Sequence, residues 1–97
     1  MKKKILVVED EASIRLNLTL MLKGEGYELD SAEDGRAGIE HAKSFAPDLI
    51  VSDVMMPELD GFGMLEALRA DPRFADTPFI FLTALNDRAS MRRGMNL

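Results

Sequence analysis

Short strand-like runs alternate with segments whose apolar residues recur at helical spacing, and this alternation constrains the fold most strongly. The strand-like runs span residues 4–8, 28–32, 49–52 and 79–83. Continuous apolar runs such as 5–8 are typical of strands buried on both faces of a parallel sheet. Because strand–helix–strand units connect parallel strands by right-handed crossovers, the pattern predicts an α/β fold, a doubly wound parallel sheet with helices on both faces.

The segments between these runs predict the helices. The first helix is closed by Gly24 and Gly26, and the second begins at Gly35 and is ended by Pro47. A third helix is expected over residues 61–70 and a fourth from about Asn86. The residues expected to face inward are Ile14, Leu18, Met21 and Leu22, then Gly38, Ile39, Ala42 and Phe45, then Leu65 and Leu68. The polar alternation of residues 28–32 favours an edge position for the second strand.

Composition narrows the class of protein. With 97 residues the chain is expected to form one small domain, and its 46% apolar content argues against global disorder. No apolar run approaches the roughly 20 residues that a membrane helix needs, and Lys2–Lys4 precede too few apolar residues for a signal peptide. Without cysteine there is no disulfide, thiolate nucleophile or zinc–thiolate site. The net charge of −5 argues against nucleic-acid binding by this segment. We expect a cytoplasmic protein without a membrane partner.

Oxygen-bearing side chains follow three of the predicted strands. Asp53 follows the apolar run 49–52, Glu9 and Asp10 follow the first run, and Thr83 ends the fourth. The carboxyl ends of parallel strands meet at one edge of a sheet, so these groups are expected to share a site. Two carboxylates about 4 Å apart repel by roughly 1 kcal/mol in water and more inside a protein. A hard divalent cation removes this repulsion, and oxygen-only ligands favour Mg²⁺.

This cluster predicts phosphoryl chemistry on a carboxylate. A carboxylate can accept a phosphoryl group, and the transfer needs mainly positioning and charge neutralisation. Asp53 is the best candidate acceptor, the Thr83 hydroxyl can donate to a phosphoryl oxygen, and Ala84 leaves room for that group. Taken singly, Glu9 and Asp10 are equally well explained as the start of a helix and Asp53 as a turn residue. Their occurrence at successive strand ends favours the functional interpretation. His41, among polar neighbours, is expected to be a solvated surface residue.

Three sequence blocks together resemble the receiver domain of two-component response regulators. They are Ile5 to Glu11, Asp53 to Pro57 with Asp60-Gly61, and Leu82-Thr83-Ala84. Their order and spacing agree with the family along the whole chain. The resemblance implies a flavodoxin-like receiver fold with sheet order 2-1-3-4-5. This chain stops before the fifth strand and fifth helix, so we expect the order 2-1-3-4 in one C-terminally incomplete receiver domain, residues 1–97.

The resemblance also implies residue roles. Asp53 would be the phospho-acceptor, supplied by a phosphohistidine on a sensor histidine kinase or phosphotransfer protein. The implied Mg²⁺ ligands are Asp53, Asp10, Glu9 (directly or through a water) and the backbone carbonyl of Met55. Thr83 would be the switch hydroxyl, with Ala84 beside the phosphoryl group. Met55 and Leu85 occupy the two positions that set phosphoryl lifetime, and because both are apolar we expect slow self-dephosphorylation.

The chain departs from the family in lacking a lysine after Thr83. Because the fifth strand is also missing, the fourth strand would be an exposed apolar edge, which predicts a homodimer paired through it. Beyond the segment, an output domain is expected. One alternative function is a receiver-like interaction module that works without phosphorylation. Another is a phosphatase with an aspartate nucleophile, which would need a second acid where Met55 stands. We therefore expect a signalling module that phosphorylates itself from a donor and is otherwise not an enzyme.

Overall fold

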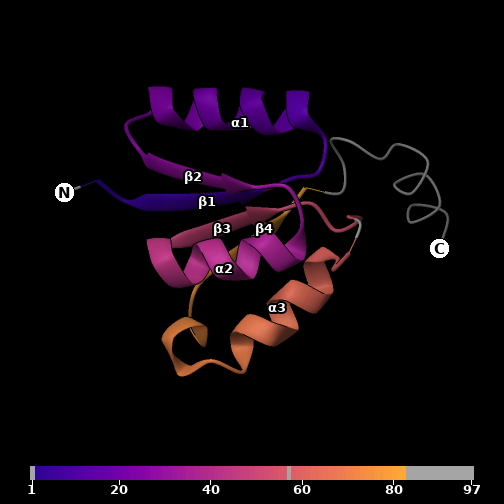
Figure 1. Ribbon diagram of the computed structural model, residues 1–97. Helices are drawn as coiled ribbons and strands as arrows, with labels where there is room; N and C mark the ends of the chain where they lie inside the picture. The colour runs from indigo at the N-terminus through magenta and orange to yellow at the C-terminus, as the bar shows by residue number, and fades with distance from the viewer. Residues whose placement is uncertain (1, 57, 83–97) are drawn as a thin grey trace, which may run out of the picture.

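The described part of the computed structural model, residues 2–56 and 58–82, contains a parallel sheet of four strands (Figure 1). The strands are β1 (Lys4–Val8), β2 (Glu28–Ala32), β3 (Leu49–Ser52) and β4 (Phe79–Phe81). They are ordered β2-β1-β3-β4, and every neighbouring pair is parallel. This confirms the predicted doubly wound α/β fold and the order 2-1-3-4, with β2 at an edge. The carboxyl ends of the strands lie toward the right of Figure 1.

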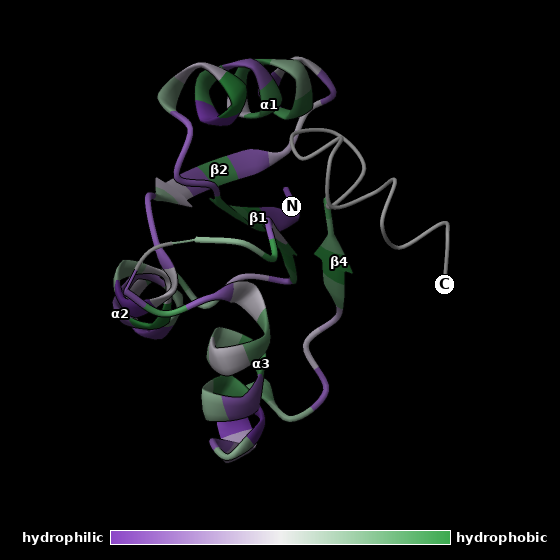
Figure 2. Cartoon of the chain, turned by 90° about the vertical axis from the view of Figure 1, so that its right-hand side faces the viewer, coloured by the Kyte–Doolittle hydropathy of each residue, from purple (hydrophilic) through white to green (hydrophobic). Residues whose placement is uncertain are grey.

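Helices cover both faces of the sheet. Helix α1 (Ala12–Gly24) lies on one face, and α2 (Gly35–Phe45) and α3 (Gly61–Arg69) lie on the other (Figures 1 and 2). A short 3₁₀ helix, η1 (Pro72–Phe74), follows α3. Proline is preorganised for a first helical position, and the Asp71 side chain accepts from the Arg73 backbone, so this turn is explained locally. Among the described helices, none is both long and apolar enough to cross a membrane.

The core consists of two apolar layers separated by the sheet. Leu6 and Val8 of β1 point to the α2/α3 side, whereas Ile5 and Val7 point to the α1 side, and all four are buried. Alternate residues of a strand face opposite sides, so burial on both faces explains the continuous apolar run. The larger cluster contains Leu6, Val8, Ala32, Ala42, Ile50, Met64, Leu68 and Phe74.

Two predicted helix faces differ in detail from the structure. Met21 was expected to face inward but is 58% exposed, so that prediction is wrong. The contacts of α1 run along Leu18 and Leu22, which lie one above the other at a spacing of four residues. On α3, Leu68 is buried as predicted, but its partner four residues earlier, Met64, is fully buried in place of Leu65.

Gly38 explains how α2 comes close to the sheet. A side chain at this position would place its Cβ 2.6 Å from Sδ of Met64 and 3.1 Å from a methyl group of Val8. Both neighbours are fully buried and have little room to move. The inward face predicted for α2 is confirmed, because Gly38 and Ala42 are buried and Ile39 and Phe45 pack against the larger cluster.

Candidate functional site

The three predicted carboxylates meet at the carboxyl edge of the sheet. Glu9 and Asp10 follow β1, and Asp53 follows its neighbour β3. Val8 and Ser52 are paired in register, so the next residues of both strands emerge side by side. One carboxylate oxygen of each acid lies within 4.8 Å of the others. The structure therefore brings together the acids that the sequence placed at successive strand ends.

The surroundings of the acids differ. Glu9 has no exposed surface and Asp53 is 3% exposed, whereas Asp10 is exposed. The backbone N–H of Glu9 donates to the Ala32 carbonyl at 3.0 Å, and Oε2 of Glu9 accepts from the Glu11 backbone at 3.0 Å. Carboxylates this close to one another repel, and a cation bound between them would remove the repulsion. The exposed side at Asp10 gives a ligand access from solvent.

The donor set fits a hard divalent cation. Magnesium prefers oxygen ligands at about 2.1 Å, so two oxygens bound to one ion lie at most about 4.2 Å apart. The carboxylate oxygens of Glu9, Asp10 and Asp53 lie within 4.8 Å of one another, close to that spacing. These residues would hold Mg²⁺, and the exposed side would leave coordination positions for water or phosphate oxygens.

The backbone around Asp53 is held by contacts that the sequence pattern does not reveal. The Asp53 N–H donates to the Val8 carbonyl at 3.0 Å, and the buried Ser52 hydroxyl donates to the Asp53 carbonyl at 2.7 Å. Gly61, the first residue of α3, packs against the same carbonyl, and a Cβ there would lie 2.4 Å from its oxygen. A polar Ser52 ending an apolar strand, followed later by Asp60-Gly61, was the available sequence signal.

Comparison with known proteins assigns the family. The model of the response regulator receiver domain matches residues 5–97. The chain belongs to this family. The probable transcriptional regulator ycf27 of Cyanophora paradoxa is 47% identical over 96 residues, covering 99% of this chain and 39% of that protein. The DNA-binding response regulator MtrA of Mycobacterium leprae is 35% identical over 95 residues, which cover 98% of this chain and 41% of that protein. This receiver chain thus spans about two fifths of these relatives' length.

Solved receiver structures agree with the fold. Chemotaxis response regulator CheY4 of Vibrio cholerae superposes with a TM-score of 0.84 at 33% identity, covering 99% of this chain and 80% of that one. The receiver domain of sensor histidine kinase PA1611 from Pseudomonas aeruginosa gives a TM-score of 0.83 at 28% identity. The match covers 95% of this chain and 75% of that one. That structure has a magnesium ion coordinated in its active site cleft. The receiver assignment and its place in two-component signalling are thereby confirmed.

The remaining residues of the predicted receiver site are only partly described. Thr83, Ala84 and Leu85 lie outside the described residues, so their roles stay predictions. The described chain does reach the site, because the Leu82 N–H donates to the Ser52 carbonyl at 2.9 Å. Met55, in the loop after β3, has a 57% exposed side chain.

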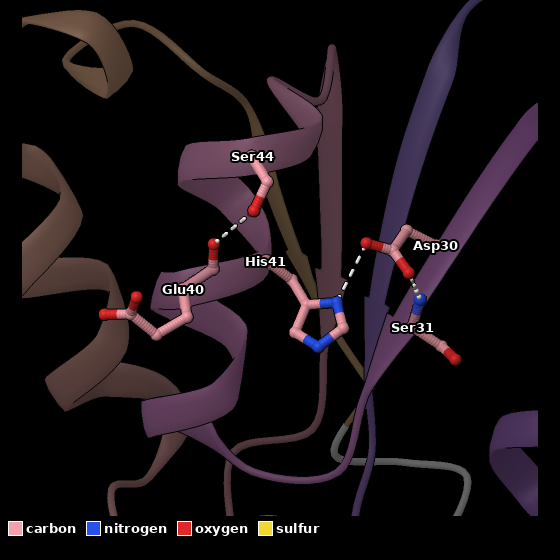
Figure 3. Close-up of polar contacts among 5 residues, drawn as sticks. All are labelled: Asp30, Ser31, Glu40, His41 and Ser44. Atoms are coloured by element: carbon pink, nitrogen blue, oxygen red, sulfur yellow. Dashed lines mark hydrogen bonds and ion pairs between the residues drawn. The ribbon is translucent and has the colours of Figure 1, made fainter.

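His41 of the receiver domain lies at the surface, as the sequence suggested, with a 41% exposed side chain, but it is also paired with a carboxylate. It is only partly exposed, and its Nδ1 lies 2.8 Å from Oδ2 of Asp30 on the edge strand β2 (Figure 3). The other Asp30 oxygen accepts from the Ser31 backbone at 2.9 Å. His41 thus joins α2 to β2, and it lines a cavity of about 290 Å³ together with Arg15 and Glu33.

Proposed function

We propose that this chain is a phospho-accepting receiver domain, in which Asp53 receives a phosphoryl group from the phosphohistidine of a sensor histidine kinase or a phosphotransfer protein. The convergence of Asp53 with Glu9 and Asp10 within 4.8 Å carries the proposal. The magnesium ion in the PA1611 receiver supports it. Phosphorylation would then alter the affinity of the domain for a partner or an attached output domain.

The chemistry requires a positioned carboxylate oxygen. An Asp53 oxygen attacks phosphorus, the new P–O bond forms, and the P–N bond to the histidine breaks. The electron pair of that bond stays on the ring nitrogen, and with a proton on its other nitrogen the ring leaves as neutral histidine. Mg²⁺, when bound, would neutralise charge on the phosphoryl oxygens. The backbone of Asp53 is kept in place by its hydrogen bonds to Val8 and Ser52.

The other residues take the roles expected for the family. Asp10 and Asp53 would bind Mg²⁺ directly, Glu9 directly or through a water, and the backbone carbonyl of Met55 would complete the protein ligands. Thr83 would donate its hydroxyl to the phosphoryl group, and Ala84 would leave room for it. Met55 and Leu85 would favour a long-lived phosphoryl group, because an apolar side chain cannot orient an attacking water.

Phosphorylation is tested with Mg²⁺ and acetyl phosphate, followed by intact-mass measurement. The wild-type chain is expected to gain one phosphoryl group, and Asp53→Asn to gain none. Asp76→Asn is the matched control, because Asp76 is exposed and makes no hydrogen bond or ion pair within the described residues. A chain that stays unmodified would instead be an interaction module independent of phosphorylation. Continuous release of inorganic phosphate would indicate an aspartate-nucleophile phosphatase.

The wider context of the domain extends this proposal. We expect residues 1–97 to act as one receiver domain, located in the cytoplasm and without a membrane partner. MtrA is named as a DNA-binding response regulator, which favours a DNA-binding output domain in a longer protein. The acidic segment itself would not bind nucleic acid. Apart from self-phosphorylation, we expect no enzymatic turnover.

A homodimer through β4 is part of the same proposal. In the described sheet β4 is the last strand, and its Ile80 side chain is 51% exposed. Unpaired edge strands readily pair with another chain. Light scattering of the 97-residue chain is expected to give the mass of a dimer, and Ile80→Lys is expected to shift it toward the monomer. A wild-type chain that stays monomeric at all concentrations would contradict the dimer alone.

A further inference from the structure

Arg15 contacts the backbone beside the acidic cluster, and this contact has no role in the proposed phosphoryl transfer. It lies in the first part of α1, is only partly exposed, and its guanidinium Nη1 donates to the backbone carbonyl of Glu9 at 2.7 Å. That carbonyl belongs to the peptide unit that joins Glu9 to Asp10. A charged side chain six residues further along therefore binds the link between two predicted metal ligands.

The position of this carbonyl controls both carboxylates. A peptide unit is planar, so holding its oxygen also fixes the directions in which the Cα atoms of Glu9 and Asp10 lie. The N–H of Glu9 is held independently by the Ala32 carbonyl. With its N–H tied to β2 and its carbonyl tied to α1, the backbone of Glu9 is held from two sides. Asp10, which is exposed, has less packing of its own to fix its direction.

The positive charge of Arg15 and its hydrogen bond to the Glu9 carbonyl are expected to have opposite effects on the affinity for a divalent cation. A guanidinium held at the Glu9 carbonyl is expected to lower the affinity of the site for a divalent cation, because like charges repel. A prearranged pair of ligands raises that affinity, because less ordering is needed when the ion binds. The two effects have opposite signs, so removal of Arg15 distinguishes them.

We propose that Arg15 is a positioning residue of the metal site, which holds the Glu9–Asp10 peptide unit in the orientation that a divalent cation requires. The proposal rests on the proposed function, in that it takes the acidic cluster as the magnesium site. Groups that orient the ligands of a metal typically change its affinity 10- to 100-fold when they are removed.

The first test measures Mg²⁺ binding by calorimetry in the 97-residue chain. Arg15→Met is expected to bind Mg²⁺ at least about tenfold more weakly than the wild type. Lys23→Met is the control on the same helix: it removes the same charge, and the Lys23 side chain makes no hydrogen bond or ion pair within the described residues. Arg15→Lys keeps the charge and should restore part of the affinity. Tighter Mg²⁺ binding by Arg15→Met would show that Arg15 acts through charge alone and would overturn the proposal.

The second test needs no metal. Amide ¹⁵N relaxation of Asp10 and Glu11 in the metal-free chain is expected to show increased motion in Arg15→Met and little change in Lys23→Met. Unchanged relaxation in Arg15→Met would overturn the positioning role even if phosphorylation of Asp53 succeeds. Conversely, a wild-type chain that binds no Mg²⁺ would contradict the proposed function, while the relaxation data would still decide the role of Arg15. Should Arg15→Met fail to fold, Arg15→Gln takes its place, and wild-type Mg²⁺ affinity together with wild-type Asp10 relaxation in that variant would overturn the proposal.

Discussion

The two faces of the sheet are packed to very different extents. On the α2/α3 face, both helices bury residues completely, among them Ala42, Met64 and Leu68. On the other face, α1 has no buried residue, and Leu16 and Leu20 are more than half exposed. Ile80 of β4 is paired in register with Val51, which belongs to the α1-side cluster, so the exposed Ile80 faces the same side. Within the described residues, the α1 side of the sheet is therefore packed less tightly than the α2/α3 side.

The helix termini show the same asymmetry. The N-cap residues of α2 and α3, Asp34 and Asp60, accept hydrogen bonds from backbone N–H groups inside their helices. The N-cap residue of α1, Glu11, makes no such side-chain bond. Stability in the described domain is therefore concentrated on the α2/α3 side. Among the described residues, the α1 side, which also carries Arg15 at the Glu9 carbonyl, has fewer buried side chains and no side-chain N-cap.

Truncating one leucine on each face should give the largest difference in the free energy of unfolding. Leu68→Ala removes a side chain that is 1% exposed, and the lost burial plus the remaining cavity should cost about 2–5 kcal/mol. Leu20→Ala, at a side chain 58% exposed, should change the unfolding free energy by about 0.5 kcal/mol or less. Urea unfolding followed by circular dichroism measures both. Equal losses would mean that the apolar surface of α1 is covered in solution, for instance by a second copy.

A pair of glycine substitutions extends the comparison to backbone packing. Gly38→Ala on α2 would place a methyl group 2.6 Å from Sδ of Met64, and such overpacking typically costs about 1–3 kcal/mol. Gly24→Ala on α1 meets no atom within 4 Å and should stabilise the helix by up to about 1 kcal/mol. The melting temperature should therefore fall in Gly38→Ala and rise in Gly24→Ala. A stabilised Gly38→Ala variant would show that the α2 interface has spare room.

These contrasts also show which features the sequence could predict. The strands and the meeting of Glu9, Asp10 and Asp53 followed from periodicity and from the rule that parallel strands end at one edge. These depend only on order along the chain. Which residue of a helix is most deeply buried depends on the rotation of that helix against its neighbours. For this reason Met64 replaced Leu65 at the centre of the α3 contact, and Met21 proved exposed.

Contacts made by long side chains could not be predicted from the sequence pattern either. The hydrogen bond from Arg15 to the Glu9 carbonyl and the pairing of His41 with Asp30 depend on rotamers and on the distance between elements. The sequence places the candidate residues on neighbouring elements but does not select the partner. The support around the carboxylates therefore became visible only in the structure, whereas the carboxylates themselves were predictable.

Substitutions at the helix N-caps should change the free energy of unfolding less than the core truncation does. Asp34→Ala removes the acceptor for the Ala37 N–H, which lies 2.8 Å from Oδ1, and should cost about 1 kcal/mol. Glu11→Ser offers α1 a better capping side chain and should leave stability equal or slightly higher. Chemical unfolding of both variants measures the difference. A marked loss in Glu11→Ser would instead point to its Oε1, which accepts from the Ser13 hydroxyl, as a needed contact.

The smallest effect is expected from a charge in the connection between α3 and β4. Hydrogen bonds from the Arg73 side chain and backbone lower the pKa of Asp71 to about 2. Because the folded-state pKa lies below the ordinary value near 3.8, the ionised carboxylate stabilises the domain above about pH 4, and this contribution disappears as the pH falls through about 2. Asp71→Asn keeps a capping oxygen but has no charge, so its melting temperature should lie slightly below that of the wild type at pH 5 and converge with it near pH 2. The comparison with the wild type cancels the titration of the other carboxylates. A difference that persists unchanged to pH 2 would show that the Asp71–Arg73 pair contributes through shape and not through charge.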